Sequence, residues 1–81
     1  MNKTTPTSAI YTLIGQRVYY WRNERGFSQQ ELANRVQVAR CSIANIEAGR
    51  QRATLGLLYR ICGALEVGIY EIIPGRYELP D

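Results

Sequence analysis

The chain is poor in two of the side chains from which active sites are often built. It contains no histidine, and its only aspartate is the last residue, Asp81. Histidine is the commonest general base near neutral pH, and positioned carboxylates usually hold a catalytic metal ion. No group of Glu, Asp or Cys residues has a spacing suited to binding a metal. We therefore expect neither an enzyme nor a metal or other cofactor.

The sequence has an excess of positive charge, and this charge is unevenly distributed along the chain. Residues 1–61 contain nine Lys and Arg against three Glu, which gives a net charge of +6. Residues 62–81 contain one Arg against three Glu and one Asp, which gives −3. A basic body with an acidic end suits the binding of a polyanion. Scattered solubilising charge is the alternative at this point.

Segment 40–48 has two unlike faces when it is drawn as a helix that turns by about 100° per residue. One side carries Ile43, Ile46 and Glu47. The other side carries Arg40, Cys41, Ala44, Asn45 and Ala48. An ordinary surface helix would carry long Lys and Glu side chains there. The short side chains predict that this backbone can approach a partner closely, although an unremarkable amphipathic helix remains the alternative.

The elements that position this segment are predicted from apolar spacing and from signals at helix ends. The predicted helices cover about 8–25, 29–36, 40–48, 55–65 and 69–73. Ser28 and Glu31 form a capping box at the start of the second, and Thr54 is the N-cap of the fourth. Gly26 ends the first helix, and Pro74 stops the fifth.

Five short helices joined by tight turns predict one compact all-α domain over residues 8–74. Polar residues 1–7 are expected to form a flexible arm, and residues 75–81 a tail. The helices at 29–36 and 40–48 are separated by only three residues, which is the spacing of a helix-turn-helix. Trp21 and Phe27 are expected in the core. Cys41 and Cys62 do not make a disulfide framework.

The stretch SQQELANRVQVARCSIANIEAGRQ resembles the Cro/Xre-type helix-turn-helix of phage and bacterial transcriptional repressors. The likeness extends over about residues 14–73, through WRNERGFSQQELA and GALEVGIYEII. It is carried by residues at fixed offsets: Arg22, Gly26, Ser28, Gln29, Leu32, Ala33, Ile43, Ile46, Glu47 and Gly49. Two positions depart from the family pattern. Gln37 replaces the usual Gly of the turn, and Ala39 replaces the usual Ser or Thr cap, at a cost of about 1 kcal/mol each.

The resemblance implies a five-helix repressor-like fold whose third helix enters the major groove of double-stranded DNA. It assigns the base contacts to Arg40, Cys41, Ala44 and Asn45. Arg can bond guanine O6 and N7 together, and Asn can pair with adenine N6 and N7. Cys41 and Ala44 offer an apolar contact to a thymine methyl. A passive surface thiol is the alternative for Cys41.

The resemblance also assigns residues that do not read bases. A phosphate contact falls to Gln29. Arg50 and Arg52, in the loop after the third helix, are expected to bind phosphates too, with solvated loop cations as the alternative. Arg22 and Glu47 are expected to form a partly buried salt bridge. Weaker phosphate candidates, more simply explained as solvated helix faces, are Arg17, Tyr19 and Arg35. The expected dimer interface consists of Ile69, Tyr70, Ile73, Tyr77 and Leu79, although this segment could instead close its own core.

These features predict a sequence-specific transcriptional regulator, a repressor acting as a homodimer on a two-fold operator. Within the same fold, an antitoxin and a restriction–modification controller protein are the alternatives. A protein-interaction module that does not bind DNA is an alternative from another class. We expect a cytoplasmic, nucleoid-associated protein of bacterial or phage origin, without a membrane span, and leave a cognate protein partner open.

Overall fold

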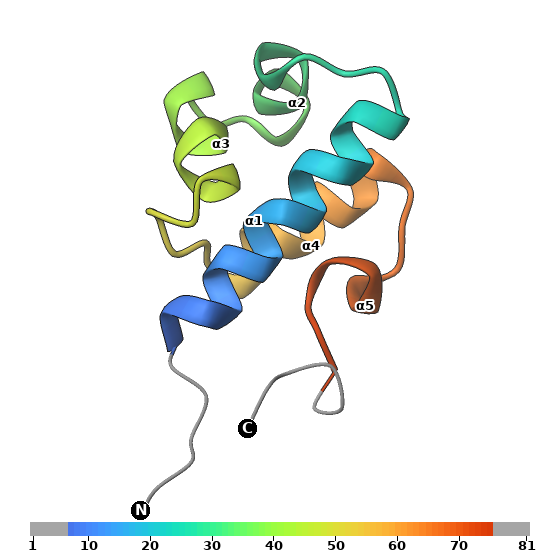
Figure 1. The fold of residues 1–81 in the computed structure, drawn as a ribbon. Helices are drawn as coiled ribbons and strands as arrows, with labels where there is room; N and C mark the ends of the chain where they lie inside the picture. Colours follow the sequence, from blue (N-terminus) through green and yellow to red (C-terminus); the bar gives the residue numbers. More distant parts are fainter. Residues whose placement is uncertain (1–6, 76–81) are drawn as a thin grey trace, which may run out of the picture.

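The computed structural model describes residues 7–75 as five helices joined by turns, with no strand among them (Figure 1). The helices are α1 (Thr7–Glu24), α2 (Gln29–Val36), α3 (Arg40–Glu47), α4 (Leu55–Leu65) and α5 (Ile69–Ile72). The predicted all-α class is confirmed. The predicted helix ends differ by one residue at most, because Thr7 already belongs to α1 while Ala48 and Ile73 follow the last helical residues. The rest of the predicted arm and tail lies outside the described residues.

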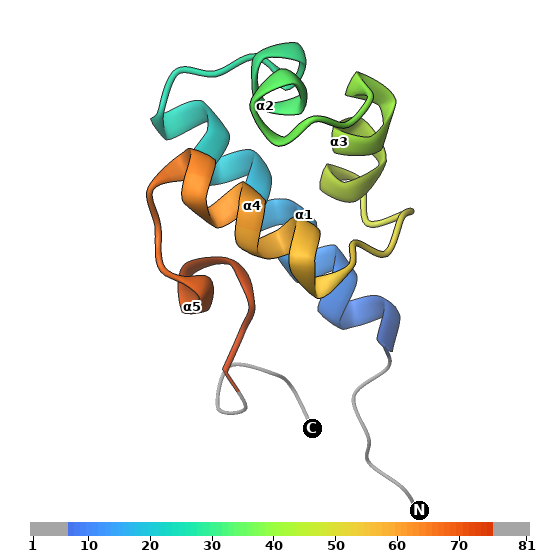
Figure 2. The same cartoon turned by 180° about the vertical axis from the view of Figure 1, so that it is seen from behind.

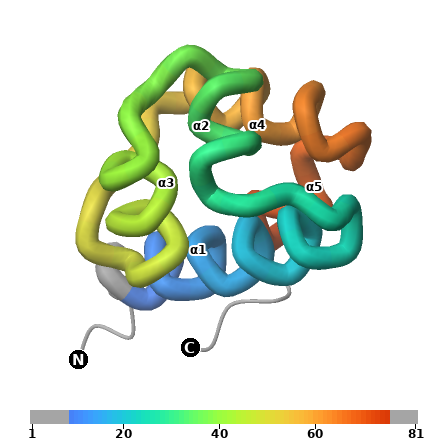
Figure 3. The backbone as a smooth tube through the Cα atoms, turned by 90° about the horizontal axis from the view of Figure 1, so that it is seen from above, coloured from blue at the N-terminus to red at the C-terminus, as the bar shows by residue number. Residues whose placement is uncertain are grey.

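The helices are arranged around α1, which packs against α3, α4 and α5. α2 packs against α3 and α4, and α4 also contacts α5. Viewed from either side, α1 and α4 cross the centre of the molecule, with α2 and α3 along one side of this pair (Figures 1 and 2). α3 and α5 lie on opposite sides of α1 (Figures 1 and 3). The arrangement leaves the outer side of α3 uncovered by the other helices.

The core forms where the apolar stripes of the helices meet. Its largest fully buried side chains are Val18, Leu32, Val36, Ile43, Ile46, Ile61, Leu65 and Ile72. Burying one such side chain is worth about 1.5–3 kcal/mol. Trp21 and Phe27 lie at the margin of this core rather than inside it, since both are only partly buried. The guanidinium of Arg25 covers the Trp21 ring at 5.1 Å, and that of Arg35 covers the Phe27 ring at 4.3 Å.

Side-chain caps begin α2 and α4 as predicted. The Ser28 hydroxyl accepts the Glu31 N–H at 3.0 Å, and the Glu31 carboxylate accepts the Ser28 N–H at 2.8 Å. These bonds, above all the one from the Ser28 backbone, lower the pKa of Glu31. The Thr54 hydroxyl accepts the Leu57 N–H at 3.1 Å. Both helix starts therefore have their free N–H groups partly satisfied.

The turn between α2 and α3 is closed without glycine. Gln37 adopts the left-handed conformation, with φ 62° and ψ 47°, which costs a residue with a Cβ about 1 kcal/mol relative to glycine. Ala39 has the extended backbone of an N-cap, but no side chain caps α3. The two departures from the family pattern are thus accommodated, and the helix-turn-helix geometry is kept.

Candidate nucleic-acid interface

Close packing against α1 fixes the position of α3. Ile43 and Ile46 point into the core and are completely or almost completely buried. Gly15 of α1 lies directly beneath the last turn of α3. A Cβ atom on Gly15 would come within 2.3 Å of the Ile46 carbonyl oxygen and 2.7 Å of the Glu47 carbonyl oxygen. The absence of a side chain at Gly15 therefore sets how deeply α3 sits.

The face of α3 that points away from the core carries all four residues expected to contact bases. Arg40 and Cys41 are exposed, and Ala44 and Asn45 are half-buried. Ala48, which is also exposed, continues this face past the end of the helix. The large exposed hydrophobic side chains of the described residues belong to α1, α4 and α5, and none belongs to α3.

Arg22 and Glu47 form an ion pair between α1 and the end of α3, as the resemblance implied. The Arg22 guanidinium donates to both carboxylate oxygens of Glu47, at 2.6 and 3.1 Å, and to the Phe27 carbonyl at 2.7 Å. Both charged side chains are almost fully buried. The hydrogen bonds with Glu47 raise the pKa of Arg22. This pair ties the end of α3 to α1.

Gln29 extends this ion pair to the outer face of α3. Its Nε2 donates to Glu47 at 3.0 Å, and its Oε1 accepts a hydrogen bond from Arg40 at 3.2 Å. Sequence analysis assigned Gln29 to a phosphate and missed this role. The only signal was that Gln29 begins α2 while Arg40 begins α3, on either side of a short turn. The side chain of Arg40 is therefore held from α2.

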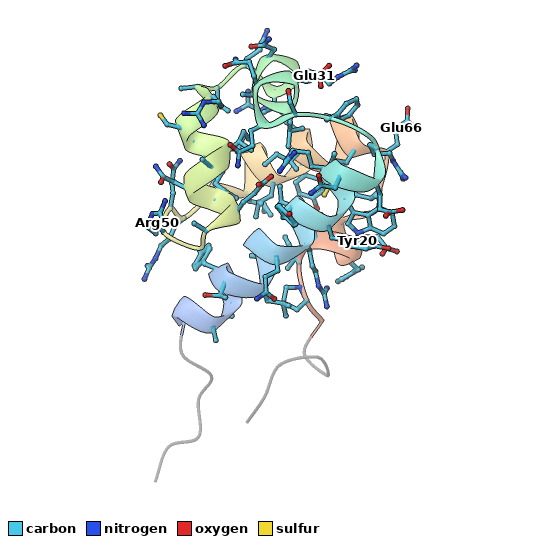
Figure 4. All side chains as sticks on the ribbon, turned by 45° about the horizontal axis from the view of Figure 1, so that its top comes forward. Tyr20, Glu31, Arg50 and Glu66 are labelled. Atoms are coloured by element: carbon cyan, nitrogen blue, oxygen red, sulfur yellow. The ribbon has the colours of Figure 1, made fainter. Side chains whose placement is uncertain are left out.

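Arg50 holds the second polar side chain of the face. Its Nη2 donates to the Asn45 Oδ1 at 3.2 Å, a contact that the sequence did not predict. Arg50 lies on the α3 side of the molecule, away from Tyr20 and Glu66 (Figure 4). Arg52, in the same loop, has its guanidinium 5.4 Å from the centre of the Tyr11 ring. Both loop arginines are exposed, which is what a phosphate contact requires.

The weaker phosphate candidates contact other parts of the protein. Arg17 Nη1 donates to the Tyr70 carbonyl at 3.4 Å. Tyr19 lies beneath the Arg22 guanidinium at 5.4 Å, and Arg35 covers Phe27. These contacts give each residue a role within the fold.

The residues expected at a dimer interface differ in how exposed they are. Tyr70 is 75% exposed, whereas Ile69 and Ile73 are half-buried against the core. Tyr77 and Leu79 lie outside the described residues.

Other kinds of site were also sought in the structure. Among residues 7–75, no three His, Cys, Asp or Glu side chains are grouped so that they could bind a metal ion. No helix of this part of the chain is long and apolar enough to cross a membrane. The face of α3 is therefore the candidate site that the described residues offer.

The sequence of this chain is similar to those of known helix-turn-helix proteins. Residues 18–72 match the helix-turn-helix family model. The HTH-type transcriptional regulator SinR of Bacillus subtilis is 30% identical over 67 residues, which cover 82% of this chain and 60% of SinR. The immunity repressor of Bacillus phage phi105 is 33% identical over 60 residues, which cover 74% of this chain and 42% of the repressor. The chain thus spans at most about three fifths of these two relatives.

Solved structures give the same result. The restriction–modification controller protein C.AhdI from Aeromonas hydrophila superposes with a TM-score of 0.77 at 26% identity, over 80% of this chain and 98% of that one. SinR in complex with DNA superposes with a TM-score of 0.67 at 33% identity, over 70% of this chain and 92% of that one. The chain belongs to the helix-turn-helix family, of the Cro/Xre type that its sequence resembles, a family of transcriptional regulators and not of enzymes.

Proposed function

We propose that this protein is a sequence-specific DNA-binding transcriptional regulator that places α3 in the major groove. The observation that carries the proposal is the outer face of α3, where small side chains surround two polar ones, Arg40 and Asn45, each held from outside the helix. The major groove is about 12 Å wide and admits a helix whose outer side chains are short or can bond base edges. The relative SinR, solved with DNA, supports the same reading.

The surroundings of α3 suit the DNA backbone. Arg50 and Arg52 follow the helix in an exposed loop, from which their guanidinium groups can reach phosphates. Gln29 opens α2, where the N–H groups that the capping box leaves unused favour an anion. Phosphate contacts of this kind position a protein on DNA without reading its sequence. We assign Gln29, Arg50 and Arg52 to this role, with Arg40, Cys41, Ala44 and Asn45 facing the bases.

We further propose a repressor that binds a two-fold operator as a homodimer. The relative from phage phi105 is named an immunity repressor. An exposed Tyr70 on α5, at the opposite end of the molecule from α3, offers a contact surface that would leave both reading helices accessible. A restriction–modification controller is the second candidate, because 98% of C.AhdI superposes on this chain.

A module that binds only protein is less well supported. Such a module should expose large apolar side chains on α3, and the described residues expose none there. SinR has also been solved with the protein SinI, so a protein partner and DNA binding are compatible within this family.

Selection of bound fragments from a random DNA library, followed by binding measurements, tests the function. Arg40→Ala should weaken binding to the selected sequence by about 1–3 kcal/mol and binding to random DNA much less, because a base contact is lost. Arg52→Ala is the matched control for charge. It should weaken binding to both DNAs alike and reduce the slope of log affinity against log salt by almost one unit. A protein that selects no sequence contradicts the proposal. If Arg40→Ala weakens binding to the selected and the random DNA equally, Arg40 contacts the DNA backbone and not a base.

A further inference from the structure

We infer that Arg50 determines which base Asn45 reads, by fixing the orientation of the Asn45 amide. The inference rests on the proposed function and concerns the same face of α3. The Arg50 Nη2 donates to Asn45 Oδ1 at 3.2 Å. The loop that carries Arg50 is itself anchored to this residue, because the Asn45 carbonyl accepts the N–H groups of Arg50 at 2.9 Å and Gln51 at 3.2 Å. The backbone of Arg50 is therefore held next to the residue whose amide its side chain contacts.

The chemistry of arginine decides which end of the amide it holds. A guanidinium group has five N–H donors and no acceptor, whereas an asparagine amide has one accepting oxygen and one donating NH₂ group. Only Oδ1 can face Arg50. Among the described residues, the Nδ2 group of Asn45 has no hydrogen-bond partner. Asn45 therefore turns its oxygen toward Arg50 and leaves the two donors of Nδ2 as the end of the amide without a partner.

This orientation changes the base expected opposite Asn45. Bidentate pairing with adenine needs both ends of the amide, since the oxygen accepts from N6 while the nitrogen donates to N7. Guanine presents two neighbouring acceptors, N7 and O6, and no donor on its major-groove edge. An amide whose free end is the NH₂ group, with its oxygen held by Arg50, matches guanine better than adenine. We therefore expect Asn45 to select guanine, although its residue type alone favours adenine.

The same library selection, repeated with variants, tests the inference. Asn45→Ala identifies the base pair that Asn45 reads, as the position where preference disappears. At that position the unchanged protein should prefer guanine over adenine by about fivefold or more, the discrimination of one well-formed base contact. In Arg50→Ala the amide is free to turn, and this preference should fall below about twofold or pass to adenine. Arg52→Ala, which removes the same charge from the same loop, should leave the preference for guanine unchanged.

A second variant reverses the polarity of the contact without changing its shape. Asn45→Asp keeps an oxygen for Arg50 and replaces the outward NH₂ by a second oxygen, which only accepts. The preferred base at this position should become cytosine, whose N4 is a donor. A change to cytosine supports the inference. Retained preference for guanine in Asn45→Asp would overturn it.

The remaining outcomes separate this inference from the function on which it rests. If Arg50→Ala lowers binding to every sequence by one factor and leaves the base preference unchanged, Arg50 is a phosphate contact only and the inference is wrong. If Asn45→Ala alters no position while the protein still selects a sequence, Asn45 reads no base and the inference is again wrong. If the unchanged protein selects no sequence, the proposed function fails and the inference fails with it.

Discussion

At the scale of single residues, Arg22 is the one charged residue among the described residues that is buried as a whole, and three hydrogen bonds compensate for its charge. Two go to the Glu47 carboxylate and one to the Phe27 carbonyl. Removing one partner of such a pair leaves a charge buried without compensation, which typically costs about 3–5 kcal/mol. In this protein Gln29 still donates to Glu47, so the loss should fall in the lower part of that range.

The expected result is a marked loss of stability in Arg22→Ala and a partial recovery in the double variant with Glu47→Ala, because no lone charge remains buried. Thermal unfolding measures both. A domain of this size loses about 4–8 °C in Tm for each kcal/mol. Arg35→Ala, which removes an exposed arginine, is the control and should change stability by less than about 1 kcal/mol. Unchanged stability in Arg22→Ala together with lost DNA binding would make Arg22 a phosphate contact.

The sequence predicted the individual residues unequally. The Arg22–Glu47 pair followed from family offsets, since both side chains extend from rigid helices whose packing is set by the core. The contacts of Gln29 with Arg40 and of Arg50 with Asn45 were not predicted. They depend on side-chain rotamers across a turn and in a loop, and residue spacing does not determine these.

At the scale of elements, α2, α3 and α4 begin with the same backbone conformation at the N-cap but not with the same cap. The N-cap residues Ser28, Ala39 and Thr54 have φ between −66° and −75° and ψ between 150° and 165°. Ser28 and Thr54 use their hydroxyl groups to accept a helix N–H, and Ala39 has none to use. A hydroxyl at position 39 would therefore need little backbone movement to cap α3.

Ala39→Ser should stabilise the protein by about 0.5–2 kcal/mol, because it supplies the missing acceptor. Thr54→Ala is the reciprocal control and should destabilise it by a similar amount, since the bond to the Leu57 N–H is lost. Denaturant unfolding of the two variants gives both values. If Ala39→Ser has no effect while Thr54→Ala does, then the free N–H groups at the start of α3 are already satisfied by water at no cost.

The contact between α1 and α3 gives a second prediction at this scale. Gly15→Ala should destabilise the protein by about 1–3 kcal/mol, because its Cβ would overlap the carbonyl oxygens at the end of α3. Gly63→Ala is the matched control within α4, where a new Cβ meets nothing within 4 Å, and it should stabilise by about 0.5–1 kcal/mol. Opposite signs in denaturant unfolding are the expected result. If both substitutions stabilised the protein equally, α3 would be able to move away from α1 without a loss of stability.

Helix boundaries were predictable because their signals are local. The capping box at Ser28, the cap at Thr54 and the stop at Pro74 each act within a few residues. The left-handed conformation of Glu66, with φ 58°, was not predicted, because no glycine marks it. The position of Trp21 at the margin of the core was not predicted either, since the apolar stripe on α1 is wider than the core that it contacts. Periodicity indicates which face turns inward, but not where the core ends.

At the scale of the whole molecule, the two ends of the domain differ in chemistry. α3 and the loop with Arg50 lie at one end, and α5 lies at the other (Figures 3 and 4). The acidic Glu66 lies on the side away from Arg50 (Figure 4). A partner at the α5 end would therefore not cover the outer face of α3. It would also lie away from the positive charge of Arg50. This geometry suits a two-fold dimer that presents one α3 to each half of an operator.

The dimer prediction rests on Tyr70, the most exposed large hydrophobic side chain of the described residues. Sedimentation at micromolar concentration without DNA should show a dimer or a monomer–dimer equilibrium, with half-sites roughly 34 Å apart in the selected DNA. Tyr70→Ser should weaken association about tenfold or more, since buried tyrosines are frequent hot spots of interfaces. Leu55→Ser is the control, because Leu55 is also exposed but begins α4, at the far end of that helix from α5. A strictly monomeric protein that binds one unrepeated half-site would contradict the dimer, and equal effects of both substitutions would place the interface elsewhere.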